Sequence, residues 1–235
     1  QYVTVGSDIL AEAREFERGN TATVNAYVQP VMGRYLGSLS SMLGQAGYRH
    51  DLLVMQTNGG VMAAELASRY SVHTLLSGPA AGVIAAAHVS GLAGYKNVIT
   101  CDMGGTSFDV GVVVDGAPAL TPERDLDYSL PVRIPMIDIH TIGAGGGSIA
   151  WIDKGGMLRV GPTSAGAVPG PICYGRGGSQ PTITDANMIL GRVDPDTLPI
   201  ERSGITQQHV RDRIAESIGG RLGLDAEAAA LAIVK

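Results

Sequence analysis

The stretch VITCDMGGTSFDVGVVV, residues Val98–Val114, decides the fold. Its apolar runs at 98–101 and 108–114 predict two buried strands, because short β-branched segments bounded by turn residues are typical of sheets. Drawn out straight at ~3.3 Å per residue, Asp102 and Asp109 would lie about 23 Å apart. A reversal at the Gly-Gly pair between them instead brings both carboxylates to one end of a hairpin.

The turn of this hairpin has the chemistry of a phosphate-binding loop. Glycine leaves the backbone unobstructed, so amide N–H groups can approach phosphate oxygens, and neighbouring hydroxyls add donors. The candidate cofactor-binding residues are Gly104, Gly105, Thr106 and Ser107. Asp102 and Asp109 are candidate catalytic residues and ligands of Mg²⁺, an ion that keeps much of its water shell. An ordinary hairpin, with the aspartates capping its turn, is the alternative that so short a pattern leaves open.

The segment before the hairpin bears on the choice between a phosphate-binding hairpin and an ordinary one. Residues 77–83, SGPAAGV, place Pro79 where a helix would begin, and small apolar residues continue to about Gly91–Gly94. The order of helix, loop, strand, D-x-G-G-T-x-x-D turn and strand resembles the superfamily of actin, sugar kinases and heat-shock chaperone ATPases. The resemblance implies an α/β fold with ribonuclease H-like lobes, each a mixed sheet flanked by helices. It also implies that the hairpin contacts the phosphates of ATP bound with Mg²⁺.

Longer motifs are similar to the hydantoinase A and oxoprolinase family. They are, in chain order, LLVMQTNGGVM (52–62), TLLSGPAAGVIAAA (74–87), DIHTIGAGGGSIAWID (138–153), RVGPTSAGAVPGPICYGRGG (159–178) and PTITDANMILGR (181–192). The resemblance implies an ATP-dependent enzyme that phosphorylates and opens a cyclic amide of the hydantoin or 5-oxoproline type, with a hydantoinase B-type partner subunit or domain. The alternatives are a ketone carboxylase subunit of the acetone carboxylase type and a non-enzymatic nucleotide switch of the actin or chaperone kind.

One departure from the chaperone pattern bears on mechanism. Where the chaperone ATPases carry a glutamate before the proline of this helix, the chain has Gly78. A carboxylate that positions water is therefore missing at that point. The resemblance then implies phosphoryl transfer to a bound substrate oxygen instead of simple ATP hydrolysis.

The resemblance also predicts an incomplete pair of lobes. Residues 1–95 would form the latter part of the first lobe, and residues 96–235 the start of the second. The family's first lobe carries a glycine-rich hairpin of its own, and no such segment precedes residue 52. We therefore expect an internal fragment of a larger enzyme. Because the superfamily holds its nucleotide between lobes, we expect the fragment alone to be inactive.

A second candidate site lies in residues 135–142, PMIDIHTI. Alternation along a strand puts Asp138 and His140 on one face, where a neutral imidazole oriented by the carboxylate can act as general base or metal ligand. A structural polar pair is the alternative. The next segment, GAGGGS at 143–148, lets a ligand touch the backbone, and its candidate cofactor-binding residues are Gly145, Gly146 and Gly147. A strand follows it instead of a helix, which argues against a dinucleotide fingerprint.

The Gly- and Pro-rich connection at 161–180 is typical of a binding loop. Arg176 is its candidate for contacting an anionic ligand. Cys173 has no histidine nearby in the sequence, so we interpret it as a packing residue and not as a nucleophile. Just beyond the loop, Thr184 is predicted to cap a helix that starts at Asp185, whose carboxylate suits the positive end of a helix.

A long helix is predicted near the N-terminus. After a short amphipathic helix at 8–18, apolar residues recur every three or four positions from Thr21 or Thr23 until Gly44–Gly47. Pro30 is expected to kink this helix, because proline lacks the N–H that the helix needs. The aromatic residues on the apolar stripe are expected to lie in the core.

Composition argues against several classes of function. The chain has 17 Lys and Arg against 22 Asp and Glu, a net charge of −5, so no nucleic-acid surface is expected. A G-x-x-x-x-G-K-[ST] segment is missing, which argues against a P-loop NTPase. The longest apolar segment, 80–89, is too short to span a membrane. Cys101 and Cys173 form no C-x-x-C pair, which predicts reduced thiols, no zinc site and a cytoplasmic location.

Overall fold

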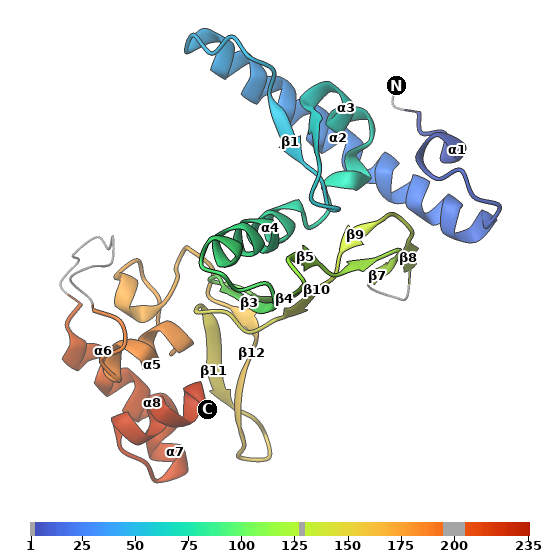
Figure 1. Ribbon diagram of the computed structural model, residues 1–235. Helices are drawn as coiled ribbons and strands as arrows, with labels where there is room; N and C mark the ends of the chain where they lie inside the picture. Colours follow the sequence, from blue (N-terminus) through green and yellow to red (C-terminus); the bar gives the residue numbers. More distant parts are fainter. Residues whose placement is uncertain (1–2, 127–129, 195–204) are drawn as a thin grey trace. The chain divides into compact units, whose positions relative to one another are not determined.

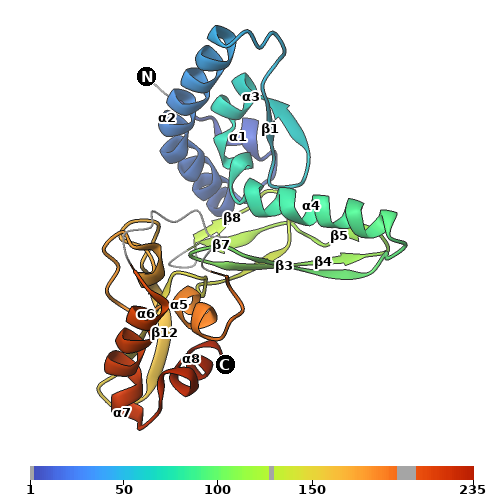
Figure 2. The same ribbon diagram turned by 90° about the vertical axis from the view of Figure 1, so that its left-hand side faces the viewer.

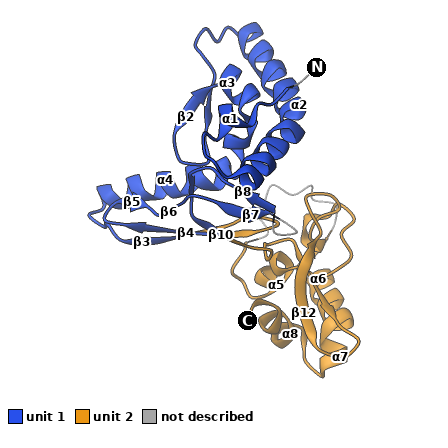
Figure 3. Ribbon diagram, turned by 90° about the vertical axis from the view of Figure 1, so that its right-hand side faces the viewer, with its two compact units in different colours: residues 1–100, 110–140 blue, residues 101–109, 141–235 orange. Residues whose placement is uncertain are grey.

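The structure, a computed structural model, describes residues 3–126, 130–194 and 205–235. The chain divides into two compact units (Figure 3), unit 1 with residues 1–100 and 110–140, and unit 2 with residues 101–109 and 141–235. Residues 96–100 and 110–140 pack with the N-terminal part of the chain. The assignment to two lobes of a larger enzyme stays a prediction.

The helices of unit 1 are dominated by one of 31 residues (Figure 1). In chain order they are α1 (Gly6–Ile9), α2 (Glu15–Gln45), α3 (Ala64–Arg69), the 3-10 turn η1 (Ser71–Thr74) and α4 (Ser77–Leu92). The prediction that α2 begins at Thr21 or Thr23 is wrong, because the helix already runs from Glu15 and includes Pro30. The Thr21 hydroxyl does not cap a helix end but donates to the carbonyl of Glu17, four residues back, at 2.7 Å.

The packed side of α2 is mostly polar. Its buried residues are Thr21, Asn25, Gln29 and Leu36, whereas Tyr27 and Tyr35 are 83% and 59% exposed. The prediction that the aromatic stripe lies in the core is therefore wrong. Asn25 explains the inversion: its carbonyl accepts from Val72 N at 3.0 Å and its amide donates to Arg69 O at 3.1 Å. A polar side chain is needed at Asn25 because it satisfies backbone groups of the α3–η1 turn.

Both long helices end where glycines were expected to stop them. At the end of α2, Tyr48 N donates to Leu43 O at 2.9 Å around Gly47, whose φ is 89°. At the end of α4, Tyr95 N donates to Ser90 O at 2.8 Å in the same way. Glycine suits these turns because the left-handed backbone after a helix is strained for other residues.

The strands from β1 to β10 build one larger sheet and three small pairs. The sheet has the order β10-β4-β3, with β5 beside β4; the pairs are β1-β2, β6-β9 and β7-β8. The bounds are β1 Leu53–Met55, β2 Val61–Ala63, β3 Val98–Met103, β4 Phe108–Val114, β5 Ala117–Pro118, β6 Leu120–Thr121, β7 Arg124–Leu126, β8 Leu130–Val132, β9 Met136–Ile137 and β10 Ile139–Ile142. Figure 2 shows α4 lying along β3, β4 and β5. Ala80 and Val83 of α4 form a buried cluster with Val113, Ile137 and Ile139.

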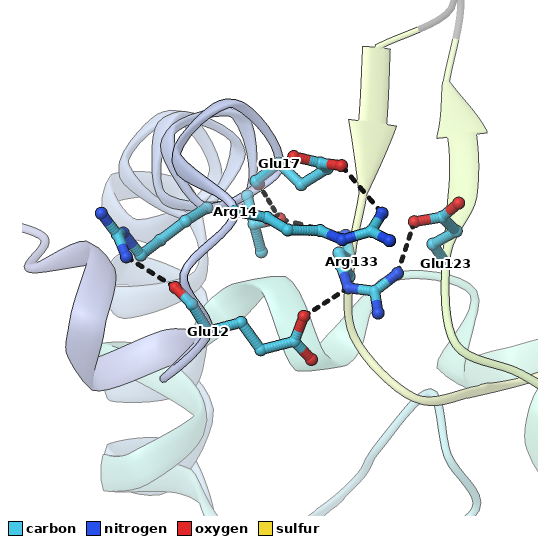
Figure 4. A network of polar contacts seen from close by, with 7 residues as sticks. Glu12, Arg14, Glu17, Glu123 and Arg133 are labelled. Atoms are coloured by element: carbon cyan, nitrogen blue, oxygen red, sulfur yellow. Dashed lines mark hydrogen bonds and ion pairs between the residues drawn. The ribbon is translucent and has the colours of Figure 1, made fainter.

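An ion-pair network ties the start of α2 to the β7-β8 pair (Figure 4). Arg133 donates through Nε to Glu12 at 2.7 Å and through Nη1 to Glu123 at 2.8 Å, and these hydrogen bonds raise its pKa. The backbone N–H of Arg133 donates to the Thr21 hydroxyl at 3.0 Å. The core cluster of Val72, Val132, Ile134 and Met136 belongs to the same unit.

Unit 2 packs a β-hairpin against short helices. The hairpin is β11 (Ser148–Ile152) with β12 (Leu158–Ser164), and the helices are η3 (Ile172–Tyr174), α5 (Ile183–Ile189), α6 (Gln207–Ile214), a π-helical turn (Ala215–Gly219), α7 (Gly220–Leu222) and α8 (Ala226–Val234). Their core includes Ala150, Ile172, Ala186, Ile214 and Ala230. Of the helices that the structure describes, none is long and apolar enough to cross a membrane.

Candidate functional site

The tip of the β3-β4 hairpin belongs to unit 2 and is a tight turn. Gly104 N donates to Ser107 O at 2.9 Å, so these two residues pair and Gly105 and Thr106 form the reversal. Asp102 and Asp109 lie two residues back from this pair on each strand. In an antiparallel hairpin such residues face each other on the same side, about 4.5–5.5 Å apart at Cβ. The predicted approach of the two carboxylates therefore follows from the register of the turn.

Two hydroxyls hold the second of these aspartates. Thr141 Oγ1 in β10 donates to Asp109 Oδ1 at 2.7 Å, and Ser107 Oγ is 3.4 Å from Asp109 Oδ2. Asp109 is half-buried, whereas Asp102 and Thr106 are exposed. The Ser107 hydroxyl is thus turned back toward Asp109 instead of outward to a ligand. Thr141 was missed in the sequence because only strand pairing reveals that it reaches Asp109.

The predicted glycine-rich loop packs directly on the hairpin tip. Gly146 N donates to Gly104 O at 2.9 Å, and Gly147 N donates to Gly105 O at 2.7 Å. Gly145 N donates to the Ser148 hydroxyl at 2.9 Å. The amides of the three loop glycines are therefore engaged within unit 2. Their contribution to ligand binding stays a prediction, while their observed contacts position the tip.

The close approach of these segments requires glycine in the loop. A methyl group on Gly145 would lie 2.5 Å from Thr106 N, and one on Gly147 would lie 2.9 Å from Gly105 O. Real Cβ atoms do not approach backbone atoms so closely, so any side chain would push the tip away. Glycine at 145 also leaves the space beside the Thr106 amide clear. Among the described residues, no hydrogen-bond partner is recorded for the amides of Gly105 and Thr106.

The start of α5 supports the loop from behind. Both the amide and the hydroxyl of Thr184 donate to Gly146 O at 2.8 Å. The prediction that Thr184 caps α5 is wrong, because Thr182 occupies that position and shares a capping box with Asp185. The signal was present in the sequence, since Thr182 and Asp185 have the spacing of a capping box. Thr184 is then free to bind the loop.

Asp185 is a structural anchor in a fully buried position. Its carboxylate accepts from the amide and hydroxyl of Thr182 at 2.9 and 2.8 Å, from Cys173 N at 2.8 Å and from Ile172 N at 3.2 Å. Four donors satisfy the charge without an open approach, so Asp185 does not line a cleft. Burial and the neighbouring carboxylate raise the pKa of the Cys173 thiol, which fits the predicted packing role and not a nucleophile.

The second predicted pair lies in unit 1. Asp138 and His140 are both exposed, and Asp138 N donates to Ala119 O at 2.9 Å. His140 and Thr141 are consecutive in β10, so their side chains point to opposite faces of the strand. Because Thr141 binds Asp109, His140 does not point to the face that carries that carboxylate. The structure thus brings the hairpin tip and the glycine loop together within unit 2. Asp138 and His140 belong to unit 1, and their role stays a prediction.

The hairpin tip fits the chemistry of Mg²⁺ and a phosphate. In the described part of the chain no three or more His, Cys, Asp or Glu residues gather as a metal site. Magnesium nevertheless uses only one or two carboxylates and completes its shell with water and substrate phosphates. Asp102 and Asp109 supply such a pair. The amides of Gly105 and Thr106 are donors of the kind that bind phosphate oxygens. Arg176, in the exposed loop, donates to Ala167 O at 3.5 Å.

Comparison with solved structures identifies the class of protein. A nucleotide-free structure of acetone carboxylase, described under the mechanism of ATP-dependent acetone carboxylation, matches with a TM-score of 0.85 and 30% identity. The match covers 97% of this chain and 32% of that chain. The chain therefore has the α/β fold of one part of this carboxylase, and the predicted fold class is confirmed.

The chain belongs to the Hydantoinase/oxoprolinase family, whose signature matches residues 18–235. Caprolactamase subunit alpha of Pseudomonas jessenii is 41% identical over 234 residues, which is 99% of this chain and 33% of the relative. 5-Oxoprolinase 1 of Arabidopsis thaliana is 41% identical over 201 residues, which is 85% of this chain and 15% of the relative. The predicted family is confirmed, and the chain spans a third or less of the length of these relatives.

Proposed function

We propose that the intact protein uses ATP to phosphorylate and open a cyclic amide of the 5-oxoproline, hydantoin or lactam class. The observation that carries the proposal is the hairpin tip between Asp102 and Asp109, whose Gly104 and Gly105 are held against a glycine loop. The names of the similar caprolactamase and 5-oxoprolinase support a cyclic amide as substrate. The likeness to acetone carboxylase supports a second candidate, ATP-dependent activation of a ketone for carboxylation.

Each residue of the tip has a proposed task. Asp102 and Asp109 hold Mg²⁺, with Asp109 oriented by the hydroxyl of Thr141. The amides of Gly105 and Thr106 donate to phosphate oxygens and stabilise the charge that develops during transfer. When bound, ATP supplies the phosphoryl group that makes the ring carbonyl a better target for water. Asp138 and His140 remain the proposed acid–base pair of the intact enzyme.

The test is ATP turnover by the intact protein with its partner subunits. Hydantoin, 5-oxoproline and caprolactam are offered singly, and acetone is offered with and without bicarbonate. We expect phosphate release that depends on a cyclic amide, and a fall of at least about 100-fold in Asp102→Asn and Asp109→Asn. Asp125→Asn, which alters an exposed carboxylate of β7, is the matched control and keeps full activity.

Other results would favour a different function or contradict the proposed site. Turnover that needs a ketone and bicarbonate favours the carboxylase. Nucleotide-driven assembly or peptide-stimulated ATPase activity without turnover of small molecules favours a mechanical switch. Full activity in both hairpin variants contradicts the proposed site whatever the substrate.

The proposal includes a separate partner. Several relatives are named as subunits, among them caprolactamase subunit alpha and the beta subunit of acetone carboxylase. We propose a hydantoinase B-type subunit or domain as the partner, and a cytoplasmic location. Co-purification of the full-length protein with a tagged partner, analysed by gel filtration, tests this part.

A further inference from the structure

The connection between β12 and α5 leaves the glycine loop and returns to it. At its start Ala165 N donates to Gly147 O at 2.8 Å, and at its end Thr184 N donates to Gly146 O at 2.8 Å. Gly146 and Gly147 are the two residues whose amides bind the hairpin tip. We call residues 166–181 the return loop, and all of it belongs to unit 2, as the tip does. Both ends of the return loop are therefore anchored beside the tip.

The middle of the return loop is held in place at two points. At the first point, the buried carboxylate of Asp185 accepts from the amides of Ile172 and Cys173. At the second, a methyl group on Gly178 would overlap with Gly170 O, so two passes of the loop meet backbone to backbone. Only glycine permits an approach this close. The short segment between the two points is thus presented by a rigid frame.

Arg176 lies in this segment and carries a charge without a carboxylate partner among the described residues. Three other arginines of unit 2 each pair with a carboxylate, namely Arg159, Arg211 and Arg213. The Arg176 guanidinium instead lies 6.0 Å from the centre of the Tyr174 ring and donates to Ala167 O at 3.5 Å. A guanidinium has five N–H donors, so these contacts leave most of them for a further acceptor.

Three consecutive backbone amides add donors at the same place. In the part of the chain that the structure describes, the N–H groups of Arg176, Gly177 and Gly178 have no recorded acceptor. Arg176 and Gly177 are exposed, so a ligand can reach them. The segment therefore combines a positive charge with several free N–H donors. An oxyanion suits such a set, because it offers acceptors alone and its charge strengthens each hydrogen bond.

We propose that Arg176 and the amides of Gly177 and Gly178 form an oxyanion subsite beside the hairpin tip. The oxyanion comes from one of two sources, a phosphate of the nucleotide or a carboxylate on the cyclic amide, which 5-oxoproline carries and caprolactam lacks. The paired N–H donors of a guanidinium match both groups. The choice of source rests on the proposed function, whereas the binding of an oxyanion does not.

Calorimetric titration of the full-length protein with its partner subunits tests the subsite. The probes are MgATP, 5-oxoproline and 2-pyrrolidinone, which is the ring of 5-oxoproline without its carboxylate. We expect Arg176→Gln to weaken the binding of one anion, MgATP or 5-oxoproline, at least about tenfold, because it removes charge-assisted hydrogen bonds. Weaker binding of MgATP assigns the subsite to a phosphate. Weaker binding of 5-oxoproline with unchanged 2-pyrrolidinone assigns it to the carboxylate.

Two further variants control for charge and for folding. Arg176→Lys keeps the charge and loses the paired donors, so its affinity should lie between those of Arg176→Gln and wild type. Arg221→Gln removes an exposed arginine of α7 and should leave both anion affinities within about twofold, because distant exposed charges are screened. Thermal midpoints within about 2 °C of wild type are expected for all three, since exposed side chains contribute little to stability.

Failure of the subsite and failure of the proposed function give different results. Unchanged affinities for both anions in Arg176→Gln overturn the subsite, even where a cyclic amide supports ATP turnover. A wild-type protein that binds neither anion overturns it as well, and so does an equal loss for 5-oxoproline and 2-pyrrolidinone with MgATP unchanged. Lack of turnover with every cyclic amide contradicts the proposed function, while the anion affinities still decide on the subsite.

Discussion

Thr141 fixes Asp109 through a short hydrogen bond, although neither its type nor its position in the sequence suggests a site. A carboxylate that is to hold an ion needs a set orientation, and a hydroxyl donor at 2.7 Å provides it. Under the proposed function, the Thr141 hydroxyl is a positioning group whose effect depends on its single donor proton. Removing this hydroxyl changes the orientation of the Asp109 carboxylate while the carboxylate itself stays in the protein.

Thr141→Val keeps the shape of the side chain and removes the donor. We expect kcat for ATP-dependent turnover by the intact enzyme to fall about tenfold, since a hydrogen bond to a charged group contributes about 1.5 kcal/mol. Thr141→Ser keeps the hydroxyl and should recover most of the rate. Steady-state kinetics of both variants measure kcat. Equal kcat values for Thr141→Val and wild type would contradict a role for the Thr141 hydroxyl in positioning Asp109.

Asp185 illustrates a buried charge held by donors alone. Asp185→Asn turns an amide NH₂ toward groups that also donate, so we expect unit 2 to lose roughly 2–4 kcal/mol of unfolding free energy. Hydrogen exchange of the α5 amides, monitored during urea unfolding, measures this loss. The matched control is Asp212→Asn, which changes an exposed carboxylate bound to Gln208 and should cost less than about 0.5 kcal/mol. A neutral Asp185→Asn would mean that the four donors find other partners.

At the scale of elements, the sequence predicted most boundaries and mispredicted which sides are packed. Glycine stops and the hairpin are local, so the ends of α2 and α4 and the strands around Asp102 agree with the structure. The burial of Asn25 depends on the backbone of Val72, 47 residues away, and no periodicity contains that information. The contact between the glycine loop and the hairpin also joins two segments about 40 residues apart in the sequence, which meet at van der Waals distance.

The two threonines near the start of α2 form a matched pair. Thr21 is fully buried and accepts from Arg133 N, whereas Thr23 is exposed and donates only to Gly19 O at 2.8 Å. We expect Thr21→Ala to lower the unfolding free energy by about 1–3 kcal/mol, because it leaves the part-buried N–H of Arg133 unpaired. Thr23→Ala should change it by less than about 0.5 kcal/mol. Equal costs in urea unfolding would contradict the polar packing of α2.

The contact between the glycine loop and the hairpin tip gives a second test at the scale of elements. Gly145→Ala places a methyl group 2.5 Å from Thr106 N, so we expect the hairpin tip to move and ATP-dependent turnover of the intact enzyme to fall more than about tenfold. Gly143→Ala is the control, because a methyl group there meets nothing within 4 Å. Comparison of kcat for the two variants is the measurement. A fully active Gly145→Ala would show that the tip tolerates displacement.

At the scale of the whole molecule, the response to pH depends in part on His73. Burial disfavours its charged form and lowers its pKa below the usual 6.5. The unfolded chain therefore binds a proton here at a higher pH than the folded chain, so stability is full above about pH 7 and falls as pH decreases through 6.5 toward the folded pKa. His73→Gln should flatten this slope in urea midpoints between pH 5.5 and 7.5. The exposed His209→Gln should keep it, and identical slopes in the two variants would exclude His73 as the cause.

The hairpin tip belongs to unit 2, yet its nine residues, 101–109, are flanked in the chain by segments of unit 1. On a ribosome, Gly105 is made about 40 residues before Gly145, which at about 5–20 residues per second is an interval of about 2–8 s. During that interval the tip has no loop to hold it, so the geometry of the tip can mature only after the loop has been made. A gene cut after residue 140 would therefore separate the tip from the glycine loop that holds it.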